Sequence, residues 1–278
     1  MNLKSPSYVS PLGRFDTRVI ALMPVAIAIN IVLGYTIQTV LKLPIYLDSI
    51  GTILVGVLAG PIPGALTGIL SNLIWQYAPG IGGGTIGPFA VVAGVIGLLA
   101  GLWGWLGVYR PRPASGAALW VPAVIAVAVI LFLASRIFGN PAYNDPSFFV
   151  PWYSTAILIV AVIMSAAVLA IVLIRHDAAG AWVALAGAVT GIVAAIISAP
   201  ISAYLFGGVT GGGTDVIVAA LRQGGADVLN ASLGQGFFSD PIDKVITSFV
   251  VYIILGGLSP RLVARFPFGE RAVLAQPA

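Results

Sequence analysis

The sequence has no cysteine and only one histidine among its 278 residues. The absence of cysteine excludes disulfide bonds and thiolate-ligated metal sites, and a single imidazole argues against a histidine-ligated metal centre. Charged residues are also scarce, at 8% of the chain, whereas a soluble domain has about 25%. So few charges cannot cover a globule of this size with solvated side chains. We therefore expect lipid to surround most of the protein.

Apolar residues, in contrast, make up 59% of the chain. A helix needs roughly 20 of them to cross a bilayer. The stretch 45–77 is too long for one span, and the two prolines of Gly60-Pro61-Ile62-Pro63-Gly64 divide it. The expected spans are 19–41, 47–60, 64–77, 86–108, 117–137, 153–174, 181–205 and 241–258. The sequence thus predicts an all-α integral membrane protein of about eight (six to eight) transmembrane helices. If 47–77 instead forms one re-entrant unit, the count becomes odd.

Basic residues give these spans an orientation. With the N-terminus in the cytoplasm, nine of the 13 basic residues fall inside, in line with the positive-inside rule. These nine are Lys4, Arg14, Arg18, Arg110, Arg112, Arg175, Arg261, Arg265 and Arg271, whereas Lys42, Arg136, Arg222 and Lys244 fall outside. Because the basic residues sit at the ends of apolar runs, the net charge of +4 does not indicate a nucleic-acid partner.

The expected organisation follows from this orientation. Residues 1–18 form a cytoplasmic N-terminal segment, 19–259 a polytopic transmembrane domain and 260–278 a cytoplasmic C-terminal tail. The first apolar run exceeds the apolar core of a signal peptide and no small-residue cleavage site follows it, so we expect it to be retained. The chain is predicted to be a multi-pass protein of the cell (plasma or inner) membrane, with both termini cytoplasmic.

A short sequence echo suggests an internal repeat. Gly-Ala-Leu-Thr-Gly-Ile-Leu at 64–70 returns as Gly-Ala-Val-Thr-Gly-Ile-Val at 187–193, and each copy is followed by Gly-Gly-Gly-Thr. A parallel repeat of four plus four spans would produce this pattern, and so would chance in helices rich in small residues. Small residues spaced by four, such as Gly56 and Gly60, serve close helix packing or the docking of another membrane subunit.

Ionisable residues near apolar helices are the first candidates for function, because a charge close to hydrocarbon usually faces a cavity or a partner. Asp48 precedes a short apolar helix and, together with Tyr46, belongs to the loop between the first two spans. An N-cap role for Asp48 is the competing interpretation. Asp240-Pro241 is interpreted as the capped start of the last span, with Asp243 and Lys244 just inside it as a candidate charge pair.

A polar and aromatic group at the outer end of the third span is the second candidate. Asn72 is followed by Trp75, Gln76 and Tyr77, and an amide beside aromatic rings suits a flat heterocycle. On the first span, Asn30, Tyr35 and Gln38 add polar groups at a similar depth. Structural hydrogen bonding within the helix bundle is the alternative for each of these residues.

The glycine-rich segment 207–215 ends in Thr214-Asp215, which completes the candidate substrate-binding set. It lacks the Gly-Lys-Ser/Thr ending of a phosphate-binding P-loop, and no such ending occurs in the chain. No pairing of nucleophile and base is visible either. We therefore expect no catalytic residue, no metal site and no cofactor in this chain.

The run from Leu43 to Asn72, with Leu-Pro-x-Tyr-Leu-Asp-Ser-Ile-Gly-Thr, Ala-Gly-Pro, Gly-Ala-Leu-Thr-Gly and Ser-Asn, resembles the substrate-binding S components of energy-coupling factor (ECF) transporters. Ser-Ala-Pro at 198–200 and Asp-Pro-Ile-Asp-Lys at 240–244 extend the resemblance. It implies a subunit that captures a vitamin- or nucleobase-like solute from outside. It also implies partners, namely a transmembrane coupling subunit and two ATPase subunits that use ATP, and places Tyr46 and Asp48 in a ligand lid.

Two features depart from that family. S components have six spans where eight are expected here. The Ala-x-x-x-Ala docking motif of the family's first helix is absent, since Val25 follows four residues after Ala21 and Asn30 follows four after Ala26. A stand-alone secondary transporter, with Asp48, Asp243 and Lys244 as coupling groups, is the first alternative function. A membrane sensor or scaffold is the alternative of another class.

Overall fold

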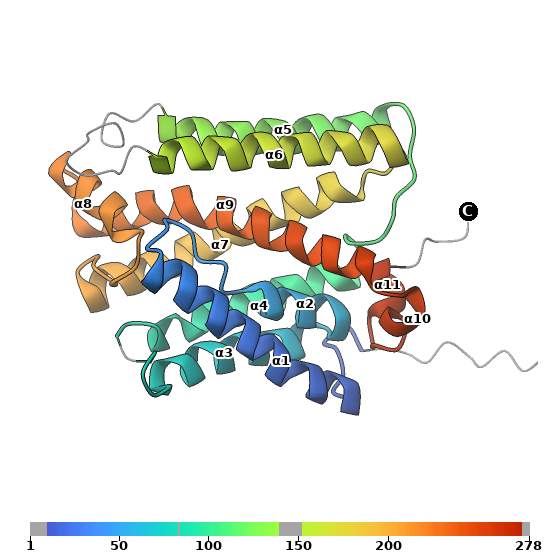
Figure 1. Cartoon of the computed structure of the whole chain (residues 1–278), viewed down its shortest axis with the longest axis horizontal. Coiled ribbons are helices and arrows are strands. Elements are labelled where there is room, and N and C mark those ends of the chain that lie inside the picture. The colour runs from blue at the N-terminus through green and yellow to red at the C-terminus, as the bar shows by residue number, and fades with distance from the viewer. Residues whose placement is uncertain (1–9, 83, 139–151, 274–278) are drawn as a thin grey trace, which may run out of the picture.

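The computed structural model describes residues 10–82, 84–138 and 152–273, and Figure 1 shows that their regular elements are helices. The expected all-α class is therefore confirmed. The elements are α1 (Thr17–Gly34), the π-helical η1 (Tyr35–Val40), α2 (Ile50–Ala59), α3 (Pro61–Tyr77), the 3-10 helix η2 (Gly87–Phe89), α4 (Ala90–Trp105), α5 (Ala117–Phe138), α6 (Trp152–Arg175), α7 (Ala179–Phe206), α8 (Asp215–Gln223), α9 (Val228–Gly257), α10 (Pro260–Val263) and α11 (Gly269–Val273). Lys4, predicted inside, and the side chain of Arg136, predicted outside, are not among the described parts of the structure.

Each predicted apolar run overlaps a helix, and the predicted break at Gly60 separates α2 from α3. Gly60 has a φ of +106°, a conformation that residues with a side chain rarely adopt. Pro61 then occupies the first position of α3, where its missing N–H costs no helical hydrogen bond. Three of the helical stretches in the described residues are long and apolar enough to cross a membrane: Thr17–Val40, Gly87–Trp105 and Ala179–Phe206. The count of eight spans stays a prediction.

The interpretation of Asp240-Pro241 as a helix start is wrong. Helix α9 begins 13 residues earlier, at Val228, where the Asp227 carboxylate accepts a hydrogen bond from the Asn230 backbone N–H at 3.0 Å. Pro241 lies inside the 30-residue helix. A proline inside a helix removes one backbone hydrogen bond and its ring crowds the carbonyl four residues earlier, which costs about 3 kcal/mol. The long apolar contact of α9 with α7 holds the helix together on both sides of Pro241.

Helices α5 and α6 form a hairpin along one side of the main body of the bundle (Figure 1). The largest apolar cluster joins α2, α4, α7 and α9 through buried residues that include Ile53, Ile96, Val183 and Val251. A second cluster packs α5 and α6 against the other face of α7 and α9. The hairpin is thus an addition to a body made of α1–α4, α7 and α9.

The two copies of the echoed motif play the same packing role. A side-chain carbon on Gly64 of α3 would lie 2.7 Å from the Gly97 carbonyl oxygen of α4, and one on Gly191 of α7 would lie 2.3 Å from the Pro241 Cα of α9. Each motif therefore brings its helix against another at backbone distance. This is internal packing, as one interpretation of the spaced glycines expected. The duplication itself stays a prediction.

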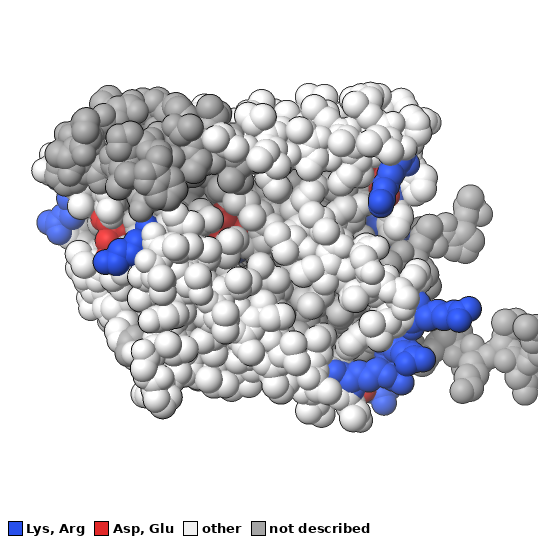
Figure 2. All heavy atoms as spheres, in the orientation of Figure 1, with Lys and Arg blue, Asp and Glu red and all other residues white. Residues whose placement is uncertain are grey.

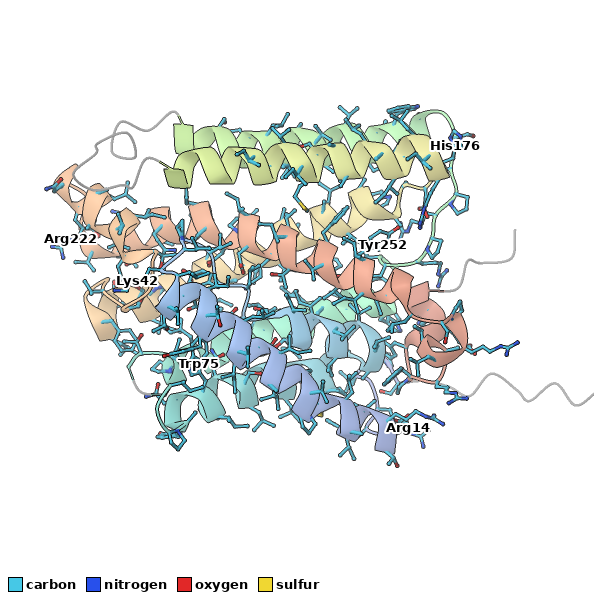
Figure 3. The ribbon with its side chains drawn as sticks, viewed as in Figure 1. Arg14, Lys42, Trp75, His176, Arg222 and Tyr252 are labelled. Atoms are coloured by element: carbon cyan, nitrogen blue, oxygen red, sulfur yellow. The ribbon has the colours of Figure 1, made fainter. Side chains whose placement is uncertain are left out.

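Both described ends of the chain lie at one end of the bundle. The Arg14 backbone N–H donates to the Ala59 carbonyl at the end of α2, and the Arg18 guanidinium donates to the Arg265 carbonyl. Arg14 and His176 lie at this end in Figure 3, whereas Lys42 and Arg222 lie at the opposite end. Charged atoms gather toward these two ends of the face in Figure 2, and the broad band between them is uncharged. That distribution is typical of a protein whose middle contacts lipid.

Candidate functional site

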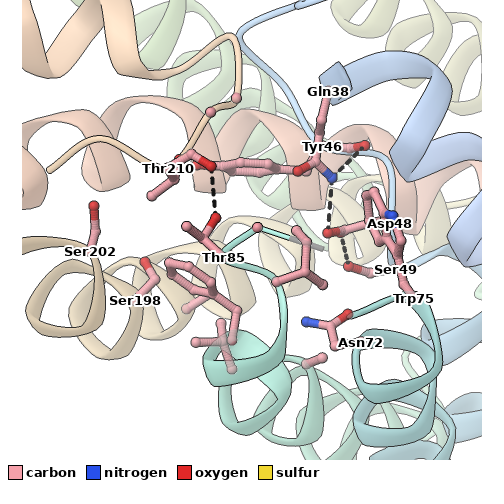
Figure 4. Close-up of a pocket in the computed structure, with 18 of the residues that line it drawn as sticks. Gln38, Tyr46, Asp48, Ser49, Asn72, Trp75, Thr85, Ser198, Ser202 and Thr210 are labelled. Carbon is pink, nitrogen blue, oxygen red and sulfur yellow. Dashed lines mark hydrogen bonds between the residues drawn. The ribbon is translucent and has the colours of Figure 1, made fainter. Parts of the chain in front are cut away.

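A cavity of about 290 Å³ opens between η1, α3, α4, α7 and α9, near the end of the bundle that carries Lys42 and Arg222. Figure 4 shows side chains from η1, α3 and α7 and from the loops beside them converging on it. A cavity of about 150 Å³ holds a benzene ring, so this one can hold a solute of one or two fused rings. Its volume is close to the lower limit of the range for ligand pockets, which is roughly 300–1,000 Å³.

The loop 41–49 before α2 is anchored to the middle of α9. The Asp243 carboxylate accepts hydrogen bonds from the backbone N–H groups of Tyr46 at 3.0 Å and Leu47 at 2.8 Å. Leu47 has a φ of +52°, a strained conformation for a residue of this type that these bonds stabilise. The anchor fixes the position at which Tyr46 and Asp48 enter the cavity wall.

Lys244 lies at the centre of an ion cluster. Its ammonium contacts the Asp243 carboxylate at 2.5 Å, the Ser49 hydroxyl at 2.8 Å and the Asp48 carboxylate at 3.5 Å. The Gln38 amide of η1 donates to the other oxygen of Asp48 at 3.2 Å. Buried charges are stable only when paired and hydrogen-bonded in this way. The cluster ties α9 to η1 and to the start of α2.

Three loops meet over the cavity. The Tyr46 hydroxyl accepts a hydrogen bond from the Gln235 amide at 2.9 Å and donates to Thr214 at 3.4 Å. Thr85 donates to the Thr210 carbonyl at 2.7 Å, which joins the loop after α3 to the loop after α7 (Figure 4). Burial, together with the nearby negative charge of Asp240, raises the pKa of Tyr46 well above its usual value. Tyr46 is therefore a neutral hydroxyl that both donates and accepts.

Two polar side chains face the cavity without a protein partner among the described residues. Asn72 of α3 is 6% exposed and lines the cavity, and its amide has no hydrogen bond to the described part of the chain. Ser202 of α7 is 5% exposed, and its hydroxyl is buried and unpartnered there. Leaving the buried Ser202 hydroxyl unsatisfied costs about 1–3 kcal/mol. Both side chains would be available for hydrogen bonds to a bound solute.

The remaining wall is apolar and aromatic. Phe89, Val92 and Ile96 line it from η2 and α4, and Phe89 stacks on Phe206 with ring centroids 6.0 Å apart. Trp75 is 3% exposed and its indole N–H donates to the Ile81 carbonyl at 3.2 Å. Apolar walls with a few converging polar groups are typical of small-molecule sites.

The structure gathers most of the sequence-predicted residues. Five of them line the cavity: Tyr46, Asp48, Asn72, Trp75 and Lys244. Asp243, Thr214 and Asp215 support it from behind through hydrogen bonds to the loops. Tyr77 lies apart from it, with 81% of its surface exposed, because it follows Trp75 by two positions and so points to another side of α3.

Two competing interpretations are also resolved. Asp48 does not cap α2, because its carboxylate accepts from Gln38, Ser49 and Lys244. Instead the Asn30 side chain of α1 accepts from the Gly51 backbone N–H at 2.7 Å. Asn30 also donates to Thr52 and Ser71, so it belongs to the structural hydrogen bonding of the bundle.

The backbone of the glycine-rich segment 207–215 already binds the Asp215 carboxylate of the same segment. Asp215 accepts hydrogen bonds from the backbone N–H groups of Thr210 and Gly211 and from the Thr210 hydroxyl. This closed turn leaves no cradle for a phosphate. In the residues that the structure describes, no group of three or more His, Asp or Glu side chains is placed to hold a metal ion.

Sequence reasoning missed Gln235, Ser198 and Ser202 and assigned Asp240 to a helix start. All four line the cavity. The signal that could have found them is the spacing of polar residues in otherwise apolar stretches: Ser198 and Ser202 are one turn apart on α7, as are Asp240 and Lys244 on α9. No protein-family model, curated protein or solved structure matches this chain.

Proposed function

We propose that this chain is a membrane-embedded solute-capture subunit of the ECF S-component type. It binds a small vitamin- or nucleobase-like ring solute from the outside and has no catalytic activity of its own. The observation that carries the proposal is the cavity in which Asn72 and Ser202 present unpartnered polar atoms beside an aromatic wall. Sites of this composition bind small flat molecules.

The position of the cavity supports capture from outside. The loops that meet over it lie at the end of the bundle opposite Arg14, Arg18 and Arg265. By the positive-inside rule the arginine-rich end faces the cytoplasm. In the proposal, loop 41–49 is the lid: it closes over the solute through Tyr46 and is anchored by Asp243.

The arrangement of helices also bears on the span count. The described residues that line the cavity come from the six-helix body and its loops, and α5 and α6 contribute none of them. In the proposal, the six-helix body corresponds to the six spans of S components. The α5–α6 hairpin then supplies the two additional spans expected in this chain. The absence of a P-loop in the sequence agrees with ATP hydrolysis by separate subunits.

A stand-alone secondary transporter is the second candidate. The observation that favours it is the ion cluster of Asp48, Asp243 and Lys244, because ionisable groups between apolar helices also mark ion-coupled pathways. The two functions differ in what the isolated chain can do.

Reconstitution into liposomes separates the two candidates. The S-component proposal expects the purified chain to retain a small molecule, to carry out no uptake by itself, and to bring down a transmembrane coupling subunit and two ATPases from native membranes. Uptake by the isolated chain, driven by an ion gradient without ATP, would overturn the proposal. Binding with neither uptake nor partner subunits would point to a sensor and overturn it as well.

A further inference from the structure

Asp240 is the least satisfied charged group of the cavity wall. It is 4% exposed, and its one hydrogen-bond partner among the described residues is the Ser198 hydroxyl at 3.3 Å. An ionised carboxylate can accept about four hydrogen bonds, and a buried carboxylate keeps its charge only beside a compensating cation. Asp240 therefore has room for further hydrogen bonds, and a positively charged solute would supply the compensation that keeps it ionised.

The one lysine of the cavity wall is already fully engaged. An ammonium has three N–H donors, and those of Lys244 are used by Asp243, Ser49 and Asp48. No arginine lines the cavity within the described residues. An anionic solute would meet two lining carboxylates, Asp48 and Asp240, and no free cation.

Polar groups on other helices indicate which further chemical groups the solute carries. Ser202 lies one turn beyond Ser198 on α7, on the same side of the helix as the partner of Asp240. Asn72 lines the cavity from α3. Its amide can both donate and accept hydrogen bonds. Tyr46 and Phe89 also line the cavity, and aromatic faces attract a cation or stack on a ring.

We infer that the solute is a compact ring compound with one positive charge, which lies against Asp240, and with a neutral hydrogen-bonding edge that meets Asn72 and Ser202. The inference rests on the proposed function, since it concerns the substrate class of the same cavity. It excludes acidic vitamins and phosphorylated compounds as the solute.

Three probes of matched ring size test the charge: ring-methylated nicotinamide, which is a cation, nicotinamide, which is neutral, and nicotinate, which is an anion. Each is added to the full chain purified in detergent, and the thermal unfolding temperature is measured. Mass spectrometry identifies any small molecule retained through purification.

We expect the cation to raise the unfolding temperature more than the other two probes, or the retained molecule to be a cation. Asp240→Asn should remove the stabilisation or lower retention by about tenfold, the usual loss for one charge-assisted hydrogen bond.

Asp227→Asn is the matched control, because it makes the same change on the same helix at an exposed cap where asparagine serves equally well. The inference about charge is overturned if nicotinamide or nicotinate stabilises the protein as much as the cation does. It is also overturned if the retained molecule has no positive charge, or if the Asp240→Asn variant binds normally. These results leave the proposed function intact. If no probe stabilises the protein and no molecule is retained, the proposed function fails together with the inference.

Discussion

The Asp243 side chain lies 3.0 Å from the Tyr46 backbone nitrogen, so that a carboxylate in the middle of α9 holds a loop 197 positions earlier in the chain. The same carboxylate pairs with Lys244. One side chain therefore fixes the loop over the cavity and balances the buried ammonium. Loss of Asp243 should affect stability and loop position together.

We expect Asp243→Ala to lower the free energy of unfolding by about 3–5 kcal/mol, because it leaves a buried ammonium with a weakened partner set and two backbone donors unpaired. Asp243→Asn should cost less, since its amide oxygen can still accept from Tyr46 and Leu47. Thermal unfolding in detergent measures both. Asp227→Asn, at the exposed cap of α9, is the control. An Asp243→Ala protein that unfolds at the wild-type temperature would contradict this role.

Asn72 and Asn30 should respond oppositely to the same substitution. Asn72→Ala should leave the unfolding temperature unchanged and reduce the amount of retained solute about tenfold, because its amide is free to bind the solute. Asn30→Ala should destabilise the fold by about 1–3 kcal/mol, since it breaks hydrogen bonds to Gly51, Thr52 and Ser71. Mass spectrometry of the purified proteins and thermal unfolding give the two readouts. If Asn72→Ala destabilises as much as Asn30→Ala does, Asn72 is structural.

The contact of α7 with α9 at Gly191 should tolerate no added side chain. In Gly191→Ala the new carbon would lie 2.3 Å from the Pro241 Cα, and the forced separation of the helices should cost about 1–3 kcal/mol. It should also weaken solute binding, because Asp240 is adjacent to this contact. Gly256→Ala, near the end of α9, meets nothing within 4 Å and should be neutral or slightly stabilising. Equal unfolding temperatures for the two variants would contradict the close contact.

Because the Tyr46 hydroxyl is buried, we expect the folded protein to lose stability at high pH. The pKa of Tyr46 in the folded protein lies above the usual 10.0 because the hydroxyl is buried. As the pH rises through 10.0, the unfolded chain releases this proton before the folded protein does, so the unfolded state binds fewer protons and stability falls. We expect the unfolding temperature to begin to drop at about pH 10 and to keep falling as the pH rises further. In Tyr46→Phe the drop should be smaller, with a remainder from the buried Tyr109, whose pKa burial also raises. An identical pH profile for the variant would show that Tyr46 is solvated.

The helices were predictable because composition and proline placement act locally. The apolar runs located the helices, and Gly60-Pro61 located the break between α2 and α3. The start of α9 was not predictable in the same way, because the packing of α9 on α7 overrides the local signal of Pro241. The position of Tyr77 away from the cavity was not predictable for a related reason. In a helix that is apolar on most sides, the sequence pattern does not show which side faces a cavity.

Part of the cavity wall was predictable because charges and amides are rare in this chain. Asp48, Asn72 and Lys244 stand out from apolar surroundings and do line the cavity. The sequence could not show which of them have free polar atoms. That distinction depends on partners distant in the chain, such as Thr52 for Asn30, and only the folded structure separates the satisfied amide of Asn30 from the free amide of Asn72.

The absence of cysteine permits a direct test of orientation, because a single introduced thiol is the only reactive one in the chain. Ser115→Cys, in the exposed connection between α4 and α5, lies at the proposed cytoplasmic side, and Gln223→Cys, at the exposed end of α8, lies at the proposed outer side. In intact cells a membrane-impermeant maleimide should label Gln223→Cys alone, and permeabilisation should add Ser115→Cys. Neither substitution removes a charge. The distribution of arginines that determines the orientation of the protein in the membrane is therefore unchanged. Labelling of Ser115→Cys in intact cells would invert the topology, placing the cavity loops in the cytoplasm and ending the proposal of capture from outside.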